Sequence, residues 1–282
     1  MTTCAITWRN KNIISTMNKK IAIIGGGNLG TAIAEGLLNS GFALPEHILI
    51  TKRNIKTLAP LEKRGVLVSD NNEEAVRFAD LVILAVKPFQ VDDILGKLKP
   101  VLQPERHLLI SVITGISISH MLKAVGKKLS VVRAMPNTAI AIQESMTCLA
   151  SHEVSREQIN YVEDLFNQLG KVVWIDEKLM DAATVLGACG TAYAMRYIRA
   201  NIQGGIEIGF DAATANLIAA QTVKGAAELL LKKGSHPEQE IDKVTTPKGC
   251  TIAGLNEMEH QGFSSSLIKG IVASYDKIAK DS

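Results

Sequence analysis

The stretch Lys20-Ile21-Ala22-Ile23-Ile24-Gly25-Gly26-Gly27-Asn28-Leu29-Gly30-Thr31-Ala32-Ile33-Ala34 decides the fold. Its apolar run, residues 21–24, predicts a buried parallel strand, and the small residues after Gly30 predict a helix. The glycine spacing between them is the phosphate-binding fingerprint of a dinucleotide-binding unit. Strand, loop and helix in this order predict a nucleotide site, whereas the three glycines alone would equally describe a glycine-rich turn in an empty α/β domain.

The residues of this loop have separate tasks. Gly25 lets the chain turn sharply, Gly27 lets the backbone approach a pyrophosphate, and Gly30 lets the helix pack closely on the strand. The helix start at Asn28 and Leu29 offers free N–H groups and a partial positive charge to the phosphates. We therefore assign all five residues to coenzyme binding.

Composition limits the possible functions. The chain has 282 residues, of which 46% are apolar and 21% charged, with a formal net charge of +3. This is typical of a soluble globular protein with room for two domains. The small charge and the lack of a basic run with interleaved aromatics exclude nucleic acid as an expected partner. The apolar run Ala182–Met195 is too short to cross a bilayer, so no membrane partner is expected.

The cysteines and the N-terminus indicate the compartment. Cys4, Cys148, Cys189 and Cys250 are far apart, and no Cys/His group has metal-ligand spacing. We therefore expect reduced thiols, no metal and a cytoplasmic protein. Residues 1–16 are interpreted as an extension or disordered tail because they lack the apolar core of a secretion signal. Their basic, acid-free composition leaves a transit peptide as the alternative.

The first half alternates strand and helix patterns. Short apolar runs separated by helices predict an N-terminal Rossmann-type domain, a doubly wound parallel sheet covered on both faces, over residues 17–176. The expected strands are 21–24, 47–51, 66–68, 81–86, 108–112, 130–133, 145–150 and 171–175, and the expected helices are 29–40, 55–64, 73–78, 92–98, 118–125 and 155–169.

From residue 177 the chain is predicted to be helical throughout. The expected helices are 179–203, 211–232, 238–243, 251–260 and 264–280. They are rich in Ala and Gly, which lets helices pack closely against one another or against a second subunit. We assign residues 177–282 to an all-helical substrate and dimerisation domain and expect a homodimer or a higher assembly of dimers, with a compact monomeric bundle as the alternative.

The end of the second strand indicates the coenzyme. In an NAD site an acid about 20 residues after the glycine loop holds the ribose 2′-hydroxyl. The corresponding residues are Thr51, Lys52, Arg53 and Asn54, and none is a carboxylate. Lys52 and Arg53 suit a 2′-phosphate, with Thr51 as an added hydrogen-bond donor. The sequence therefore predicts NADP(H), with NAD(H) as a possible second coenzyme, unless the two cations form only a solvated turn.

Two more strand ends carry candidate residues. Val86, Lys87 and Pro88 end a central strand at the carboxyl edge, where open α/β sheets bind ligands, and we assign them to the coenzyme. After the strand 130–133, Asn137 is a candidate for hydrogen bonding to substrate at the domain junction. Arg133 is expected to tie that junction together.

A polar loop in the helical half, Thr245-Thr246-Pro247-Lys248-Gly249-Cys250-Thr251, leads into a helix. Free N–H groups around Gly249–Thr251 can form an anion nest for a substrate carboxylate. An N-cap role for Thr246 or Thr251 explains one threonine equally well. The residues alone leave both interpretations open.

Together these motifs resemble the pyrroline-5-carboxylate reductases. The resemblance rests on the glycine loop and on the segments 85–88, 133–138 and 244–251, and it runs from about Lys19 to the end. It implies a Rossmann domain followed by a helical domain that interleaves with a partner. It also implies NAD(P)H-dependent reduction of 1-pyrroline-5-carboxylate to L-proline by hydride transfer to an iminium, which requires no strong protein acid.

The resemblance also implies residue roles. The threonine that hydrogen-bonds the substrate nitrogen in the family falls on Thr251, which we take as the catalytic residue. The carboxylate-binding loop falls on Thr246 and on Gly249, Cys250 and Thr251. The asparagine on the adenosine side falls on Asn72.

The chain departs from the family pattern twice. Where the family usually has Ser-Gly-Ser-Gly-Pro-Ala-Tyr, residues 187–193 read Gly-Ala-Cys-Gly-Thr-Ala-Tyr, which predicts a smoother helix and a less polar pocket wall. Where the family commonly has Ser-Pro-Gly-Gly, residues 246–249 read Thr-Pro-Lys-Gly. There Lys248 adds a charge, which attracts the substrate carboxylate or faces solvent, and removes a flexible position.

Two alternatives have different requirements. A β-hydroxyacid-type NADP dehydrogenase needs a catalytic lysine in the helix expected at 179–203, and only Lys178 lies near it. A non-catalytic NADP-binding scaffold would keep the glycine loop, while the loop at 246–251 did no chemistry.

Overall fold

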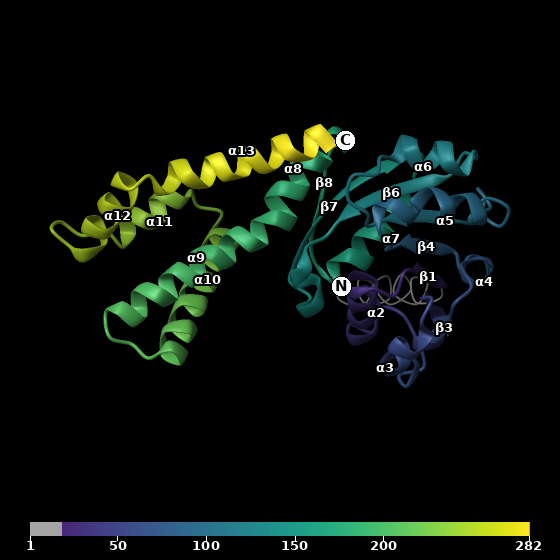
Figure 1. The fold of residues 1–282 in the computed structure, drawn as a ribbon, viewed down its shortest axis with the longest axis horizontal. Helices are drawn as coiled ribbons and strands as arrows, with labels where there is room; N and C mark the ends of the chain where they lie inside the picture. The colour runs from purple at the N-terminus through teal and green to yellow at the C-terminus, as the bar shows by residue number, and fades with distance from the viewer. Residues whose placement is uncertain (1–18, 282) are drawn as a thin grey trace, which may run out of the picture. The chain divides into compact units, whose positions relative to one another are not determined.

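A computed structural model describes residues 19–281, the side chains of 279–281 excepted. The chain forms two compact units, of which the first ends at Ala188 and the second spans Cys189–Asp281 (Figure 1). The expected extension at 1–16 and Cys4 lie outside the described residues, and Cys148, Cys189 and Cys250 are free thiols. In the part of the chain that is described, no helix has the length and apolar character of a membrane span.

The first unit is built on an eight-stranded sheet with the order β3-β2-β1-β4-β5-β6-β7-β8. Each strand predicted from the sequence is present, with small shifts at the ends. The strands are β1 (Ile21–Ile24), β2 (Ile48–Thr51), β3 (Leu67–Ser69), β4 (Leu81–Leu84), β5 (Leu108–Ser111), β6 (Ser130–Met135), β7 (Ser145–His152) and β8 (Gly170–Trp174).

One pair of strands departs from the expected parallel arrangement. β7 runs antiparallel to β6, whereas all other neighbouring strands are parallel. The reason is the short link between them, which contains only the 3₁₀ turn η4 (Thr138–Ile142). A parallel crossover needs a dozen or more residues, whereas a short link suffices for an antiparallel return. The doubly wound sheet is otherwise confirmed.

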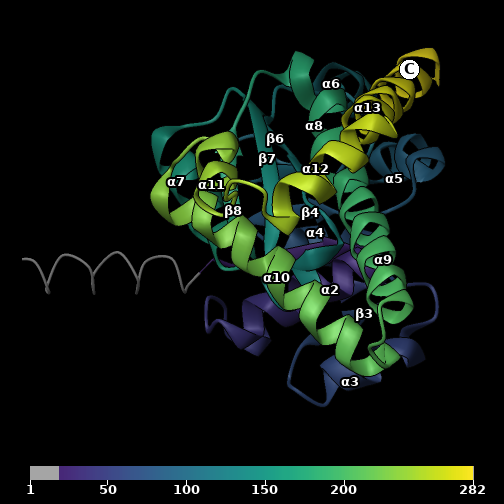
Figure 2. The same ribbon diagram turned by 90° about the vertical axis from the view of Figure 1, so that its left-hand side faces the viewer.

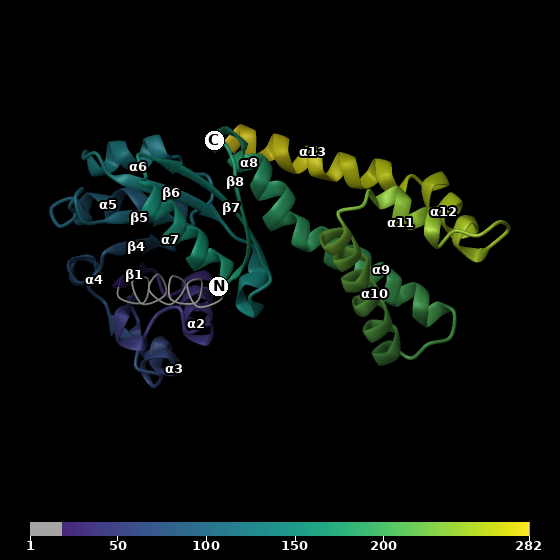
Figure 3. The same cartoon turned by 180° about the vertical axis from the view of Figure 1, so that it is seen from behind.

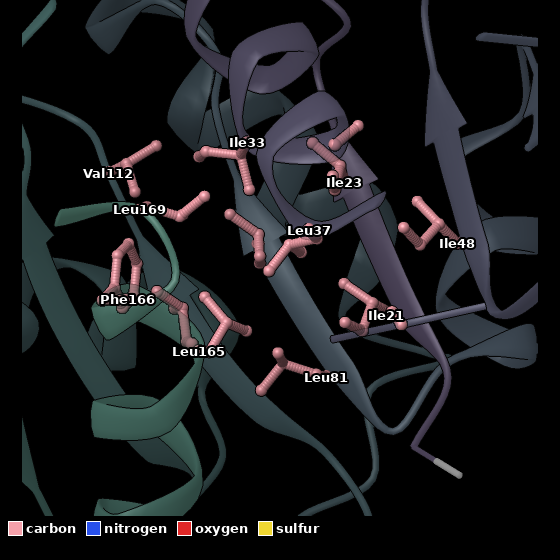
Figure 4. Packing of buried hydrophobic residues seen from close by; sticks show 14 of the residues in the cluster. Ile21, Ile23, Ile33, Leu37, Ile48, Leu81, Val112, Leu165, Phe166 and Leu169 are labelled. Atoms are coloured by element: carbon pink, nitrogen blue, oxygen red, sulfur yellow. The ribbon is translucent and has the colours of Figure 1, made fainter. Parts of the chain in front are cut away.

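Helices cover both faces of this sheet (Figure 3). Successive residues of β1 point to opposite faces, so Ile21 and Ile23 belong to one buried cluster and Ala22 and Ile24 to another. Figure 4 shows the first cluster, in which Ile21 and Ile23 lie near side chains from α2 and α7. The covering helices and turns are α2 (Asn28–Asn39), η1 (Pro45–His47), η2 (Ile55–Leu58), α3 (Ala59–Glu62), α4 (Asn72–Phe78), η3 (Pro88–Gln90), α5 (Val91–Leu98), α6 (Ile118–Val125) and α7 (Arg156–Asn167).

The chain leaves the sheet through a broken helix. η5 (Glu177–Leu179) and α8 (Met180–Ala183) are followed by a π-helical segment, Thr184–Cys189. The smooth helix expected over this region is therefore wrong. Asn137, far away in sequence, donates from Nδ2 to the carbonyl oxygen of Gly187 at 3.3 Å. Gly187 lies within the π-helical segment, where glycine weakens helix propensity.

The second unit is all helical, as predicted. α9 (Gly190–Glu207) packs against α10 (Ala212–Lys233), and Figure 2 shows the two as a helical hairpin. Small side chains permit this approach, because Ala215 and Ala219 of α10 are buried with Ile202 of α9. The remaining helices are α11 (Pro237–Lys243), α12 (Cys250–His260) and α13 (Phe263–Asp281).

Candidate active site

A cleft of about 540 Å³ opens at the carboxyl edge of the sheet in the first unit. The chain winds from β1 to β2 and β3 on one side and then to β4 on the other. Open α/β sheets bind ligands at such a switch point. The cleft is lined by Ile24, Gly25, Gly26, Gly27, Thr51, Lys52, Arg53, Asp70, Asn72, Ala85, Val86, Lys87, Gln90, Asp93, Ile94 and Lys97.

The glycine loop fits a dinucleotide. Gly25 has a φ of +112°, and a Cβ there would lie 2.5 Å from the carbonyl oxygen of Ala85. A Cβ on Gly30 would clash with the carbonyl of Gly25, so this glycine is needed for the close packing of helix on strand. A Cβ on Gly27 would meet nothing within 4 Å. Gly27 therefore borders open space, where a pyrophosphate can approach the backbone.

The N-terminus of α2 is available to an anion. Gly27 is its N-cap residue, no side chain caps the helix, and its first turn holds no acid. The first N–H groups of α2 are therefore free to donate to an anion, and the positive end of the helix dipole also attracts it. Asn28, Leu29 and Gly30 lie outside the cleft lining, and Leu29 packs against the core. These three can contribute backbone N–H groups rather than side chains.

The side of the cleft that carries the predicted 2′-phosphate residues is built by the end of β2 and the start of α4. The hydroxyl of Thr51, which is almost fully buried, donates to Oδ1 of Asn72 at 2.6 Å. The backbone N–H of Gly26 donates to the carbonyl of Thr51 at 2.7 Å, which ties the glycine loop to β2. Lys52 and Arg53 line the same wall. The structure thus places together the two cations that were predicted to hold a 2′-phosphate, whereas the hydroxyl of Thr51 already donates to Asn72 and is not free to donate to the phosphate as well.

The opposite wall starts at the end of β4. The N–H of Ala85 donates to the carbonyl of Ile24 at 2.8 Å, and Val86 and Lys87 line the cleft. Pro88, which was also assigned to the coenzyme, begins η3 outside the lining.

Sequence reasoning missed eight lining residues. Four of them lie at or just after strand ends: Ile24, Gly26, Asp70 and Ala85. The other four, Gln90, Asp93, Ile94 and Lys97, have the spacing of one helical face, and this spacing is the signal that could have found them. Asp93 and Lys97 form an ion pair at 2.8 Å on this face of α5.

The residues after β6 have structural partners. Asn137 accepts from the N–H of Ala139 at 3.0 Å and donates to Gly187, so its side chain shapes the turn after β6 and the π-helical segment. Its role toward substrate stays a prediction. Nη1 of the buried Arg133 lies 3.1 Å from Oε1 of Glu177, and both residues belong to the first unit, so its role at a domain junction also stays a prediction.

The second candidate region is the loop before α12. The N–H of Gly249 donates to the carbonyl of Thr246 at 2.9 Å, which closes a turn over Pro247 and Lys248. Lys248 has a φ of +60°. Proline followed by a residue with positive φ is the pattern of a type II turn, which normally takes glycine at the third position. The loop thus forms a turn of this pattern with a lysine in a position that favours glycine.

This turn delivers the chain to an uncapped helix. Gly249 is the N-cap residue of α12, no side chain accepts from the first turn, and that turn holds no acid. The interpretation of Thr246 or Thr251 as a simple N-cap is therefore wrong. The N–H groups of Cys250 and Thr251 have no partner within the helix, and the half-buried Thr251 sits in the same turn. Such an arrangement can bind a carboxylate.

Both halves of the chain match known families. Residues 177–281 match the model for pyrroline-5-carboxylate reductase dimerisation. Residues 20–115 match the model described as NADP oxidoreductase coenzyme F420-dependent.

Individual relatives agree with these matches. Pyrroline-5-carboxylate reductase 2 of Dictyostelium discoideum is 43% identical over 93% of both chains. Pyrroline-5-carboxylate reductase 1 of the same organism is 49% identical over 92% of this chain, which spans only 49% of that relative's length. The crystal structure of Plasmodium falciparum pyrroline carboxylate reductase with NADP bound has a TM-score of 0.83 at 29% identity, and covers 93% of this chain and 98% of its own. The chain belongs to the pyrroline-5-carboxylate reductase family.

Proposed function

We propose that this chain reduces the C=N bond of 1-pyrroline-5-carboxylate to L-proline with NADPH, with NADH as a second coenzyme. One observation carries this assignment beyond family membership: the uncapped N-terminus of α12, with Thr251 in its first turn. This arrangement suits a small ring that bears both a carboxylate and a nitrogen. The dinucleotide-shaped cleft of the first unit supports the reductant.

The first unit holds the coenzyme, which supplies a hydride when bound. The N–H groups at the start of α2 bind the pyrophosphate beside Gly27, where no side chain intervenes. Lys52 and Arg53 bind the 2′-phosphate, and Asn72 donates to the adenosine from its amide. Val86 and Lys87 border the ribose and nicotinamide.

The second unit holds the substrate. The N–H groups of Cys250 and Thr251, together with the hydroxyl of Thr246, bind the carboxylate, and Gly249, whose own N–H closes the turn on Thr246, brings the backbone close to it. The hydroxyl of Thr251 bonds to the ring nitrogen and orients the ring for hydride transfer. Because the substrate arrives as an iminium, no protein acid has to protonate it, and catalysis rests on positioning.

Assembly and location follow from other features. We propose a homodimer or a higher assembly of dimers formed through the helical unit, because large apolar side chains such as Leu217, Leu231 and Ile268 are exposed on its helices. Widely spaced free thiols support a cytoplasmic location.

A β-hydroxyacid-type dehydrogenase is less well supported. It would need a lysine in the helical stretch that starts the second half. Lys178, the one candidate, is 76% exposed and pairs with Asp176 at 2.9 Å.

Coenzyme absorbance separates the possible functions. The purified protein is mixed with NADPH and 1-pyrroline-5-carboxylate, and separately with NADP⁺ and a series of 3-hydroxy acids. Oxidation of NADPH in the first mixture, with proline as the product, is the expected result. Reduction of NADP⁺ by a hydroxy acid would favour the dehydrogenase, and no turnover in either mixture would favour a scaffold.

A further inference from the structure

We infer that Asp70 sets the coenzyme selectivity of the cleft by accepting a hydrogen bond from the ribose 2′-hydroxyl of NADH. This rests on the proposed function, since it assumes that the cleft holds the adenosine half of a dinucleotide. Asp70 directly follows β3, and it would supply the carboxylate that is missing at the end of β2.

The register of the sheet places Asp70 beside the predicted phosphate site. Thr51 of β2 is the partner of Ser69 of β3, and the N–H of Lys52 donates to the carbonyl of Ser69 at 3.0 Å. Neighbouring strands lie about 4.8 Å apart, so the residues that follow these two strands leave the sheet side by side. Both Lys52 and Asp70 line the cleft.

The backbone around Asp70 is firmly held. Oδ1 of Asn71 accepts from the N–H of Glu73 at 3.0 Å and caps α4. The N–H of Asn71 donates to the hydroxyl of Ser69, which itself donates to Glu74 at 2.7 Å. The side chains on both sides of Asp70 are thus engaged in local structure.

The carboxylate of Asp70 itself is available. It forms no hydrogen bond or ion pair with another described residue. A charged acceptor on a fixed backbone, facing a ligand cleft, is suited to bind a ribose hydroxyl.

Opposite charges at one ribose position explain dual coenzyme use. A carboxylate accepts from a 2′-hydroxyl but repels a 2′-phosphate, whereas Lys52 and Arg53 attract the phosphate. Removing the charge of Asp70 should therefore weaken the binding of NADH and favour that of NADPH. Sequence reasoning from the end of β2 found only the cations, and so it predicted NADP(H), with NAD(H) as a possible second coenzyme, without a residue that would bind the NADH ribose.

The test measures binding rather than turnover. Isothermal titration calorimetry with 5′-AMP and with 2′,5′-ADP probes the adenosine end with and without the 2′-phosphate. Asp70→Ala is expected to weaken 5′-AMP at least about fivefold, as for the loss of one hydrogen bond, without weakening 2′,5′-ADP. Asp70→Asn is expected to strengthen 2′,5′-ADP. Glu62→Gln makes the same charge change outside the cleft and should alter neither affinity.

The outcomes distinguish the inference from the proposed function. If both fragments bind the unaltered protein and Asp70→Ala changes neither affinity, or weakens both equally, the selectivity role is wrong while the coenzyme cleft stands. If neither fragment binds the unaltered protein, the coenzyme assignment and the selectivity role fall together. Circular dichroism of each variant checks that the fold is retained.

Discussion

The hydroxyl of Thr51 donates a 2.6 Å hydrogen bond to Oδ1 of Asn72, which joins the end of β2 to the first residue of α4. Because Oδ1 is occupied as an acceptor, Asn72 offers its amide N–H groups to the cleft. The orientation of a residue that lines the cleft thus depends on a buried hydroxyl behind it.

Thr51→Val tests this dependence. Valine keeps the branched shape of the buried side chain but leaves Oδ1 of Asn72 without its donor. We expect the free energy of unfolding to fall by about 1 kcal/mol and KM for NADPH to rise, with little change in kcat. Thr57→Val is the matched control, because the hydroxyl of Thr57 donates to the Asn54 carbonyl at an exposed position outside the cleft. An unchanged KM for the Thr51 variant would contradict the orientation role.

The glycine loop offers a pair of substitutions with opposite consequences. Gly27→Ala adds a methyl group into open space and should leave the melting temperature nearly unchanged. It should weaken NADPH binding, because the methyl group would occupy the space proposed for the pyrophosphate. Gly30→Ala places the methyl group against the Gly25 carbonyl and should lower both stability and binding. Calorimetry and thermal unfolding measure both effects, and equal binding by Gly27→Ala would exclude it from the phosphate site.

Arg53→Ala tests the proposed preference for NADPH over NADH. Loss of its charge should raise KM for NADPH several-fold and leave KM for NADH nearly unchanged, since only NADPH carries the 2′-phosphate. Lys56→Ala removes a nearby cation that does not line the cleft, and should change neither value. Steady-state kinetics with both coenzymes provide the measurement. An equal rise for both coenzymes would place Arg53 elsewhere on the dinucleotide.

Thr251→Ala tests the substrate site. The lost hydrogen bond to the ring nitrogen, worth about 1.5–3 kcal/mol, should lower kcat/KM at least ~10-fold. Thr251→Ser keeps the hydroxyl and should restore most of the activity. Thr245→Ala removes a hydroxyl that is already bonded to the carbonyl of Ile241, and it should have a smaller effect on catalysis. A nearly normal rate for Thr251→Ala would remove this residue from the mechanism.

Local patterns in the sequence were enough to predict most of this fold. The strands at 21–24 and 81–84 are short, fully buried apolar runs, which leave little choice of structure. The glycine loop was predictable because its spacing, its strand and its helix all indicate one motif. The motif alone was therefore enough to predict the position of the cleft, which Gly25 and Gly27 line.

The features that could not be predicted depend on contacts between distant residues. Within the π-helical segment, Gly187 accepts a hydrogen bond from Asn137, fifty residues away, and no local pattern specifies this contact. The place of Asp70 in the cleft follows from the pairing of β3 with β2, which no local pattern specifies. Lys248 likewise occupies the third position of a type II turn, where the local preference is for glycine.

The backbone conformation of Lys248 predicts that glycine at this position would stabilise the protein. A side chain in the left-handed region costs roughly 1–2 kcal/mol, and glycine avoids this cost, although its greater freedom in the unfolded chain offsets part of the gain. Lys248→Gly should therefore raise the free energy of unfolding by up to about 1 kcal/mol. Lys248→Gln removes the charge but keeps the strained backbone, and should leave stability unchanged.

Chemical denaturation of the two variants separates backbone strain from charge. Equal stabilisation by glycine and glutamine would assign the effect to the charge, and destabilisation by glycine would mean that the turn gains nothing from a more flexible residue. The expected difference between the variants would show that this loop retains a lysine at a cost in stability. The positive charge of Lys248 lies one residue before the N-cap residue of α12, where the substrate carboxylate is proposed to bind. The KM of both variants for 1-pyrroline-5-carboxylate should therefore be compared as well.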